Sequence, residues 1–228
     1  MIKFLPILLA LAYGYAAYRF SMMRSKAELD ARSAELADPV LQKSFQRLAN
    51  ALDLPRIKVH LYDIAPVNGL ASADGRVFIT RGFYEKFRSG DVTDAELASV
   101  IAHELGHVAL GHSRRRMIDF SGQNAIRMAL GGLLNRFLPG IGFWIAGALT
   151  SLLAARLSRR DEYEADAYAT ALMIKAGFGA DPQVTLLSKL GALVGQGRAT
   201  VPAWLMSHPA TEDRIAAIRG NAARWLNA

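Results

Sequence analysis

The segment from Thr93 to Val108 carries a helix start signal followed by two histidines that one metal ion can share. Thr93-Asp94-Ala95-Glu96 has the capping-box spacing that opens a helix, and apolar residues follow at helical intervals. His103-Glu104-Leu105-Gly106-His107 then forms an H-E-x-x-H pattern. Histidines four residues apart in a helix are separated by about 40° around its axis, so both imidazoles reach one metal and Glu104 can act on a water there. This pattern predicts two metal ligands and a general base; the alternative is a helix face that carries two histidines by chance.

A catalytic zinc site needs a third protein ligand, because it keeps one position open for water. The chain has no cysteine, so this ligand must be His, Asp or Glu. The continuation H-E-x-x-H-x-x-G-x-x-H fails, since Leu110 and Ser113 stand where it needs glycine and histidine. His112 would lie about half a turn away from His103 on a continuing helix, and we interpret it as structural.

The acidic segment 160–166 (RDEYEAD) is the best source of the third ligand. In a helix, Glu162 and Asp166 share a face, so one carboxylate can bind the metal while the other accepts the free N–H of a ligating histidine. The alternative is a solvated acidic face.

With these elements in order, the sequence resembles peptidase family M48, a family of membrane-associated zinc metallopeptidases. The resemblance covers about residues 55–220 and rests on Asn68-Gly69, the segment 75–82 (GRVFITRG), HELGH at 103–107, Glu162 with Asp166, and Ser207-His208-Pro209 with Arg214. It implies one Zn²⁺ per chain, with Glu162 as the third ligand and Asp166 bonded to a ligating histidine.

The resemblance also implies that His208 and Arg214 face the active site as catalytic residues. They would hydrogen-bond to the tetrahedral oxyanion, or His208 would compete for the zinc in a closed state. For Arg214 the alternative is helix capping with a salt bridge to Glu162 or Asp166.

The rest of the chain predicts a predominantly helical α+β, zincin-like domain with a small β-sheet, plus an N-terminal hydrophobic anchor. Residues 57–62 alternate as a strand does, and Asp74-Gly75 predicts a hairpin between residues 67–71 and 76–80. A further helix is expected from about residue 160 to 176. We expect a transmembrane anchor or signal segment at 1–23, a helical stalk at 24–54 and the metallopeptidase domain at 55–228; a retained anchor is favoured, because the small-residue triplets that could be cleaved lie inside the apolar run.

A second uncharged stretch, residues 137–155, contains Pro139-Gly140 and is either membrane-embedded or a buried hairpin. Arginines bracket it, as expected for residues that meet lipid phosphates, or for a solvated basic face: Arg114, Arg115, Arg116, Arg156, Arg159 and Arg160. The net charge of +7 comes without a nucleic-acid module, so we expect lipid rather than nucleic acid as a partner. We expect a bacterial inner-membrane protein, and the charges flanking the first run favour a cytoplasmic catalytic domain.

The predicted function is that of a zinc metalloendopeptidase acting on membrane or membrane-proximal polypeptides, misfolded ones included, with Glu104 as general base. The competing hypothesis is a non-catalytic zincin-fold assembly or chaperone-like factor, which would not need Glu104. The sheet edge at Asn68-Gly69 is expected to pair with substrate backbone, so Gly69→Pro should impair peptide cleavage while folding stays normal. The sequence does not predict the oligomeric state.

Overall fold

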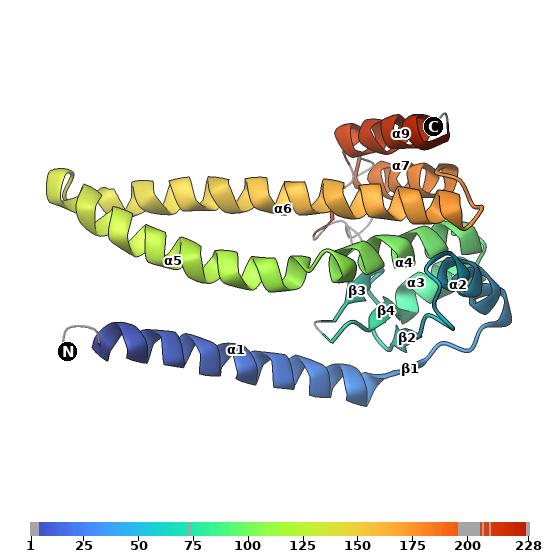
Figure 1. Ribbon diagram of the computed structural model, residues 1–228, viewed down its shortest axis with the longest axis horizontal. Helices are drawn as coiled ribbons and strands as arrows, with labels where there is room; N and C mark the ends of the chain where they lie inside the picture. The colour runs from blue at the N-terminus through green and yellow to red at the C-terminus, as the bar shows by residue number, and fades with distance from the viewer. Residues whose placement is uncertain (1–4, 73, 196–205, 207, 210, 227–228) are drawn as a thin grey trace. The chain divides into compact units, whose positions relative to one another are not determined.

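The computed structural model describes residues 5–72, 74–195, 206, 208–209 and 211–226. These residues belong to two compact units, each built from separate stretches of the chain. The sheet unit comprises residues 34–113 and 157–228, and the hairpin unit comprises residues 1–33 and 114–156. Figure 1 shows the elements of both in chain order. The domain boundaries expected after residues 23 and 54 stay predictions.

A four-stranded sheet in the order β1-β2-β4-β3 positions the edge strand that concerns the site. The strands are β1 (Ser33–Glu35), β2 (Val59–Tyr62), β3 (Gly69–Ala71) and β4 (Val77–Thr80). β2 runs parallel to β4, and β3 runs antiparallel to β4. The predicted hairpin is confirmed: the Ser72 N–H donates to the Arg76 carbonyl over 2.8 Å, and Gly75 adopts a φ of 86°. β3 is therefore an edge strand.

Helix α4 (Asp94–Ala109) is central to the sheet unit, because most of its residues are buried. It contacts α2 (Pro39–Ala51), α7 (Asp181–Gly195) and β3. The predicted capping box is confirmed: Glu96 Oε2 accepts from the Thr93 N–H (2.8 Å), and Thr93 Oγ1 accepts from the Glu96 N–H (3.1 Å). The surrounding core also draws on α3 (Arg81–Arg88) through Phe83, on α6 (Gly142–Lys175) through Met173 and on α9 (Glu212–Leu226) through Ile218. This burial fixes the orientation of α4.

Two long helices, α5 (His112–Phe137) and α6 (Gly142–Lys175), are joined by a turn in which Gly140 has a φ of 86°. The helix expected to begin near residue 160 begins instead at Gly142, because no proline interrupts residues 142–160. The uncharged stretch therefore forms the turn and the first part of α6. It is not a buried hairpin, since Phe137 is 72% exposed and Trp144 is 74% exposed.

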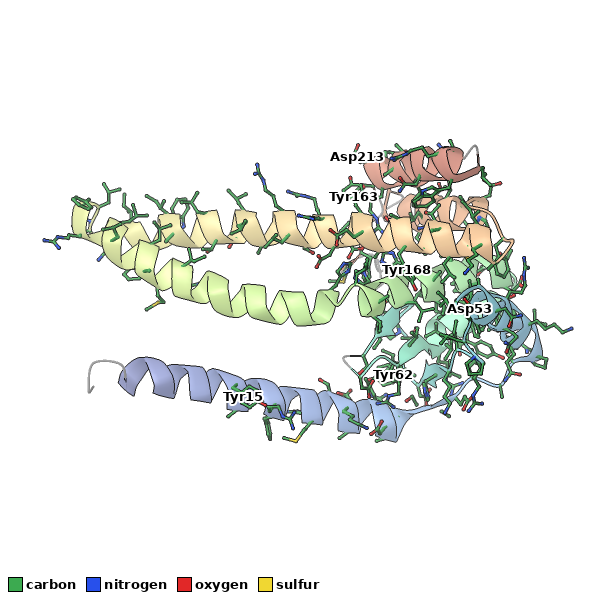
Figure 2. The ribbon with its side chains drawn as sticks, viewed as in Figure 1. Tyr15, Asp53, Tyr62, Tyr163, Tyr168 and Asp213 are labelled. Atoms are coloured by element: carbon green, nitrogen blue, oxygen red, sulfur yellow. The ribbon has the colours of Figure 1, made fainter. Side chains whose placement is uncertain are left out.

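Helix α1 (Leu5–Arg32) contains most of the expected anchor and the start of the expected stalk. Residues 1–4 of the anchor lie outside the described residues, and Tyr15, labelled in Figure 2, is 65% exposed. Among the described residues, none of the helices combines the length and apolar character that crossing a membrane requires. Asp38 caps the next helix, α2, and so confirms the break predicted at Asp38-Pro39.

Candidate metal centre

Two histidines on α4 direct their Nε2 atoms toward each other. His103 and His107 lie one helical turn apart and both are buried. Their Nε2 atoms are 3.1 Å apart, and the rings meet edge to face at 86°. The structure thus places both imidazoles on one face, as a shared metal ion requires.

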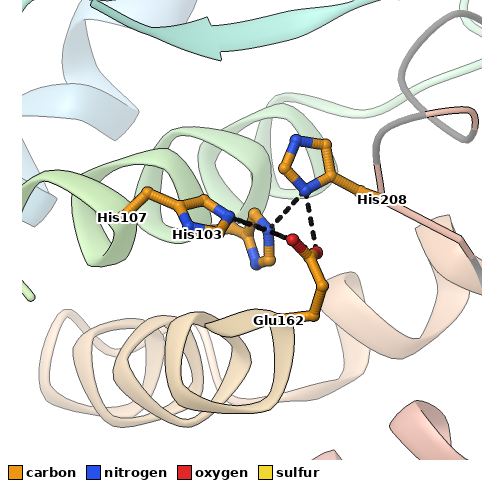
Figure 3. A group of neighbouring side chains, drawn as sticks. All are labelled: His103, His107, Glu162 and His208. Carbon is orange, nitrogen blue, oxygen red and sulfur yellow. Dashed lines mark hydrogen bonds and ion pairs between the residues drawn. The ribbon is translucent and has the colours of Figure 1, made fainter. Parts of the chain in front are cut away.

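Glu162 reaches these histidines from α6. The two helices pack closely, since a Cβ added at Gly106 of α4 would come to 3.1 Å from the Ala165 Cα. Glu162 Oε2 lies 3.4 Å from His103 Nε2, and its Oε1 lies 3.5 Å from His107 Nε2 (Figure 3). Residues about 60 positions apart in the sequence are thereby brought into one buried group.

The donor set fits zinc in both type and spacing. Bonds of about 2.0–2.1 Å to a tetrahedral zinc ion place neighbouring ligand atoms about 3.3 Å apart. The three distances here are 3.1, 3.4 and 3.5 Å. Two imidazoles with one carboxylate are also a known ligand set of catalytic zinc.

His208 adds a fourth potential ligand to the group. Its side chain is buried, with Nδ1 2.8 Å from Glu162 Oε2 and 3.3 Å from His103 Nε2. Ligand atoms of all four residues lie within 4.8 Å of one another. Figure 3 draws these four side chains together. The other ring nitrogen, Nε2, lies 3.6 Å from Glu104 Oε1. Four protein ligands would leave no position for water, which is the geometry of the closed state described above.

Asp166 contacts the opposite nitrogen of the His103 ring. His103 Nδ1 lies 3.0 Å from Asp166 Oδ1. Arg214 donates to the same carboxylate through Nε (2.7 Å) and Nη2 (2.8 Å), and its Nη1 donates to the Pro209 carbonyl. The salt bridge to Asp166, one of the alternatives for Arg214, is thus present; a role at the oxyanion stays a prediction.

The carboxylates of the group are held in their charged form. Burial lowers the pKa of His103, but hydrogen bonds to Asp166 and Glu162 outweigh it and raise that pKa to about 9. Burial raises the pKa of Glu162, yet hydrogen bonds with His103 and His208 hold it well below its usual range. Asp166 behaves likewise: hydrogen bonds from Arg214 and His103 overcome its burial and lower its pKa. Buried negative charge favours a cation at this position.

The expectation that His112 lies half a turn away from His103 is wrong, although His112 is not one of the four residues grouped as possible ligands of one metal ion. That expectation assumed that α4 continues, but α4 ends at Ala109 and Gly111 adopts a φ of 66°. The chain turns there, and His112 begins α5 fully buried, with its Nδ1 2.7 Å from His107 Nδ1. The glycine after Leu110 was the available signal, because glycine in a left-handed conformation commonly ends helices.

The edge strand β3 lies beside Glu104. A Cβ added at Gly69 would come to 3.9 Å from Glu104 Oε1. The Thr80 N–H donates to the Asn68 carbonyl over 3.0 Å, so the backbone of Asn68 faces β4. Since hydrogen-bonding direction alternates along an antiparallel strand, the N–H and C=O groups of Gly69 and Ala71 face the open edge. Of the predicted pair Asn68-Gly69, the backbone of Gly69 alone faces the open edge of the sheet.

Comparison with known proteins identifies relatives across most of the chain. Residues 35–222 match Peptidase family M48. Metalloprotease LoiP of Escherichia coli is 30% identical over 204 positions, covering 86% of this chain and 75% of LoiP. Protease HtpX of Pseudomonas paraeruginosa is 27% identical over 256 aligned positions, covering 92% of this chain and 84% of HtpX. The crystal structure of S. mikatae Ste24p is similar with a TM-score of 0.51 and 22% identity, over 82% of this chain but 50% of Ste24p, and supports the fold alone.

The mostly helical fold with a small sheet, together with these relatives, defines the protein as a metalloendopeptidase. Its site holds a cluster of histidines and a glutamate that can bind a metal ion. The chain belongs to peptidase family M48, because the family match extends over residues 35–222 of 228.

Proposed function

We propose that this protein is a zinc-dependent endopeptidase of membrane or membrane-proximal polypeptides, with one zinc ion per chain. The observation that carries the proposal is the convergence of His103 Nε2, His107 Nε2 and the Glu162 carboxylate within 3.1–3.5 Å. A second carboxylate, Glu104, adjoins this group without belonging to it. The first set supports zinc binding, and the separate carboxylate supports hydrolysis.

In the proposed mechanism, Glu104 is the general base. His103, His107 and Glu162 would hold the zinc ion, which would act as a Lewis acid that lowers the pKa of water and polarises the peptide carbonyl. Glu104 takes the proton of the attacking water and passes it to the nitrogen of the leaving amine. Because Glu104 is 2% exposed, bulk water does not compete for its carboxylate.

Asp166 and Arg214 act as positioning residues in this scheme. Asp166 accepts the Nδ1 proton of His103, which keeps the lone pair of Nε2 directed at the zinc ligands. Arg214 holds Asp166 through two hydrogen bonds and is itself 3% exposed. The pair therefore fixes the ring orientation of His103.

His208 closes the site in the resting state and has to move before water can bind. Its Nδ1 lies among the zinc ligands, while its Nε2 is near Glu104. Once displaced, it would be available to hydrogen-bond to the oxyanion. The visible spectrum of the Co²⁺-substituted protein tests this, because loss of a fourth ligand in His208→Ala should change the band positions; identical spectra would place His208 outside the ligand set.

A substrate peptide adds to the sheet along the open edge of β3. The backbone groups of Gly69 and Ala71 are available on that edge, and Gly69 adjoins Glu104. Main-chain pairing makes few demands on side chains, so broad specificity follows. The scissile bond would then lie next to the general base.

The hairpin unit makes the lipid contact in this proposal. Its turn exposes large apolar side chains: Phe137, Leu138, Ile141, Phe143 and Trp144. Exposed Arg127 and Arg136 precede the turn on α5 and would meet anionic headgroups. The side chains of Arg114, Arg115 and Arg116 lie outside the described residues.

Metal content and casein cleavage of the purified full-length protein test the proposal. We expect about one zinc per chain, loss of cleavage with a zinc chelator and recovery on adding Zn²⁺. Cleavage that persists without metal would contradict the mechanism. A zinc-loaded protein that cleaves nothing would favour the non-catalytic assembly factor.

A further inference from the structure

His107 and His112 form a second imidazole pair on the outer side of the proposed zinc ligands. Their Nδ1 atoms are 2.7 Å apart, and the ring centroids are 4.9 Å apart at an angle of 72°. His112 is fully buried. At this distance one Nδ1 carries a proton and donates it to the other.

Carboxylates surround the opposite nitrogen of His112. Its Nε2 lies 3.2 Å from Glu164 Oε2 and 3.9 Å from Asp161 Oδ1. Glu164 is in turn held by Arg160, whose Nε donates to Oε1 over 2.8 Å. The ring of His112 therefore lies between His107 and an anchored carboxylate.

His107, His112 and Glu164 form a chain of hydrogen bonds, and the proposed zinc site fixes where its protons lie. A neutral His107 that ligates zinc through Nε2 carries its proton on Nδ1. His112 must then accept at its own Nδ1, which places its proton on Nε2, facing Glu164. One neutral tautomer of each ring satisfies both contacts.

We propose that His112 is a positioning residue for the zinc ligand His107, accepting its Nδ1 proton and held in place by Glu164. This inference rests on the proposed zinc site. Each α4 ligand would then have a partner at Nδ1: the carboxylate of Asp166 for His103, and the imidazole of His112 for His107. Partners of this kind fix the tautomer and orientation of a ligating imidazole.

A second metal ion is the competing interpretation, since ligand atoms of His112, Asp161 and Glu164 lie within 4.8 Å of one another. A metal on Nε2 of a neutral His112 would put the proton on its Nδ1. That proton would face the Nδ1 proton of zinc-bound His107 across 2.7 Å, and the two would repel. The proton positions therefore favour the hydrogen-bonded chain.

Three variants of His112 separate a positioning role from packing. The oxygen of asparagine reaches the position of Nδ1 and can accept from His107, whereas the longer glutamine places its amide near Nε2, and leucine offers no acceptor. We expect His112→Leu and His112→Gln to weaken zinc binding about 10- to 100-fold, the usual loss for such a partner, and His112→Asn to recover most of it. The zinc dissociation constant is measured by competition with a chromophoric chelator.

The matched control is His60→Asn on β2, a histidine remote from the metal ligands, which should leave zinc affinity unchanged. Thermal unfolding of the zinc-free proteins reports packing separately. Wild-type zinc affinity in a folded His112→Leu would overturn the inference. If His112→Leu does not fold, the comparison of His112→Asn with His112→Gln tests the inference. Equal zinc affinity of these two variants would overturn the inference.

Three outcomes distinguish this inference from the proposed function. Two zinc ions per wild-type chain, one of them lost in His112→Asn, would replace the positioning role with a second metal site. A wild-type protein that binds no zinc would overturn both the proposed function and the inference. Wild-type zinc binding with unaltered variants would overturn the inference alone.

Discussion

The backbone of Gly69 lies against Val100 of α4, where an added Cβ would come to 2.6 Å from Val100 Cγ1. Through this contact the edge strand β3 packs against α4 beside Glu104. It also makes the expectation that Gly69→Pro folds normally wrong, because proline carries a Cβ that the site does not accommodate. We expect even Gly69→Ala to lower the free energy of unfolding by about 1–3 kcal/mol, as overpacking does.

Ala71 offers a cleaner test of substrate pairing. Its N–H faces the open edge, so Ala71→Pro removes a donor to substrate without removing a bond to β4. We expect KM for peptide cleavage to rise about 3- to 10-fold, the worth of one hydrogen bond, with zinc content unchanged. Ala71→Val keeps the N–H and is the control. Equal KM in the two variants would place the substrate elsewhere.

Glu104→Gln separates base catalysis from metal binding. The amide has nearly the same shape but takes no proton, so turnover should fall about 10²- to 10⁴-fold while zinc content stays near that of the wild type. Casein cleavage and metal analysis measure the two effects. His103→Ala, by contrast, should lose the metal. Full activity of Glu104→Gln would exclude the proposed mechanism.

Glu162 is the predicted third ligand, and its neighbours provide the comparison. Glu162→Ala should abolish tight zinc binding, and Asp166→Ala should weaken it about 10- to 100-fold. Glu164→Ala should cost less than Glu162→Ala, because Glu164 acts through His112. Glu85 is exposed, so Glu85→Ala is the control and should bind zinc as the wild type does. If zinc titrations show the same loss of zinc affinity in Glu164→Ala as in Glu162→Ala, the third ligand is misassigned.

Asp38 should make stability depend on pH. Burial raises its pKa, but the N–H groups of Leu41 and Val40, the Tyr84 hydroxyl and the Arg88 charge together lower it. A lowered folded-state pKa contributes stability above the unfolded value near 3.8, and the contribution is lost as pH falls through the folded value. Denaturant unfolding should show wild type more stable than Asp38→Asn at pH 7, with the difference shrinking toward pH 2. A constant difference would contradict the assignment.

Lipid contact of the hairpin turn is measurable with vesicles. Phe137 is 72% exposed, and burying a phenylalanine in lipid is worth about 1.5–3 kcal/mol. We therefore expect Phe137→Ser to weaken sedimentation with anionic phosphatidylglycerol vesicles about 10-fold or more. Leu54→Ser, at an exposed apolar residue of the sheet unit, is the control. Equal vesicle binding of the two variants would show that the turn does not contact the lipid.

Local patterns predicted those features that depend on neighbouring residues. The capping box at Thr93 and Glu96, the helix that carries His103 and His107, and the hairpin at Gly75 each arise from contacts within a few positions. Hydrogen bonds and side-chain contacts between residues a few positions apart can be predicted from the sequence alone. The proposed base and two of the proposed ligands belong to this group.

Only the tertiary structure showed which buried groups surround the proposed histidine ligands. Arg214 was predicted near the site, but its two hydrogen bonds to Asp166 join residues 48 positions apart. The place of His112 depended on a reversal of the chain at Gly111 and on the packing of α6 beside α4. Side chains that reach each other across separate helices are oriented by the packing of the whole core, and periodicity within one segment carries no information about it. The sequence alone thus determined the helix that carries His103 and His107, and the fold determined which buried groups contact these histidines.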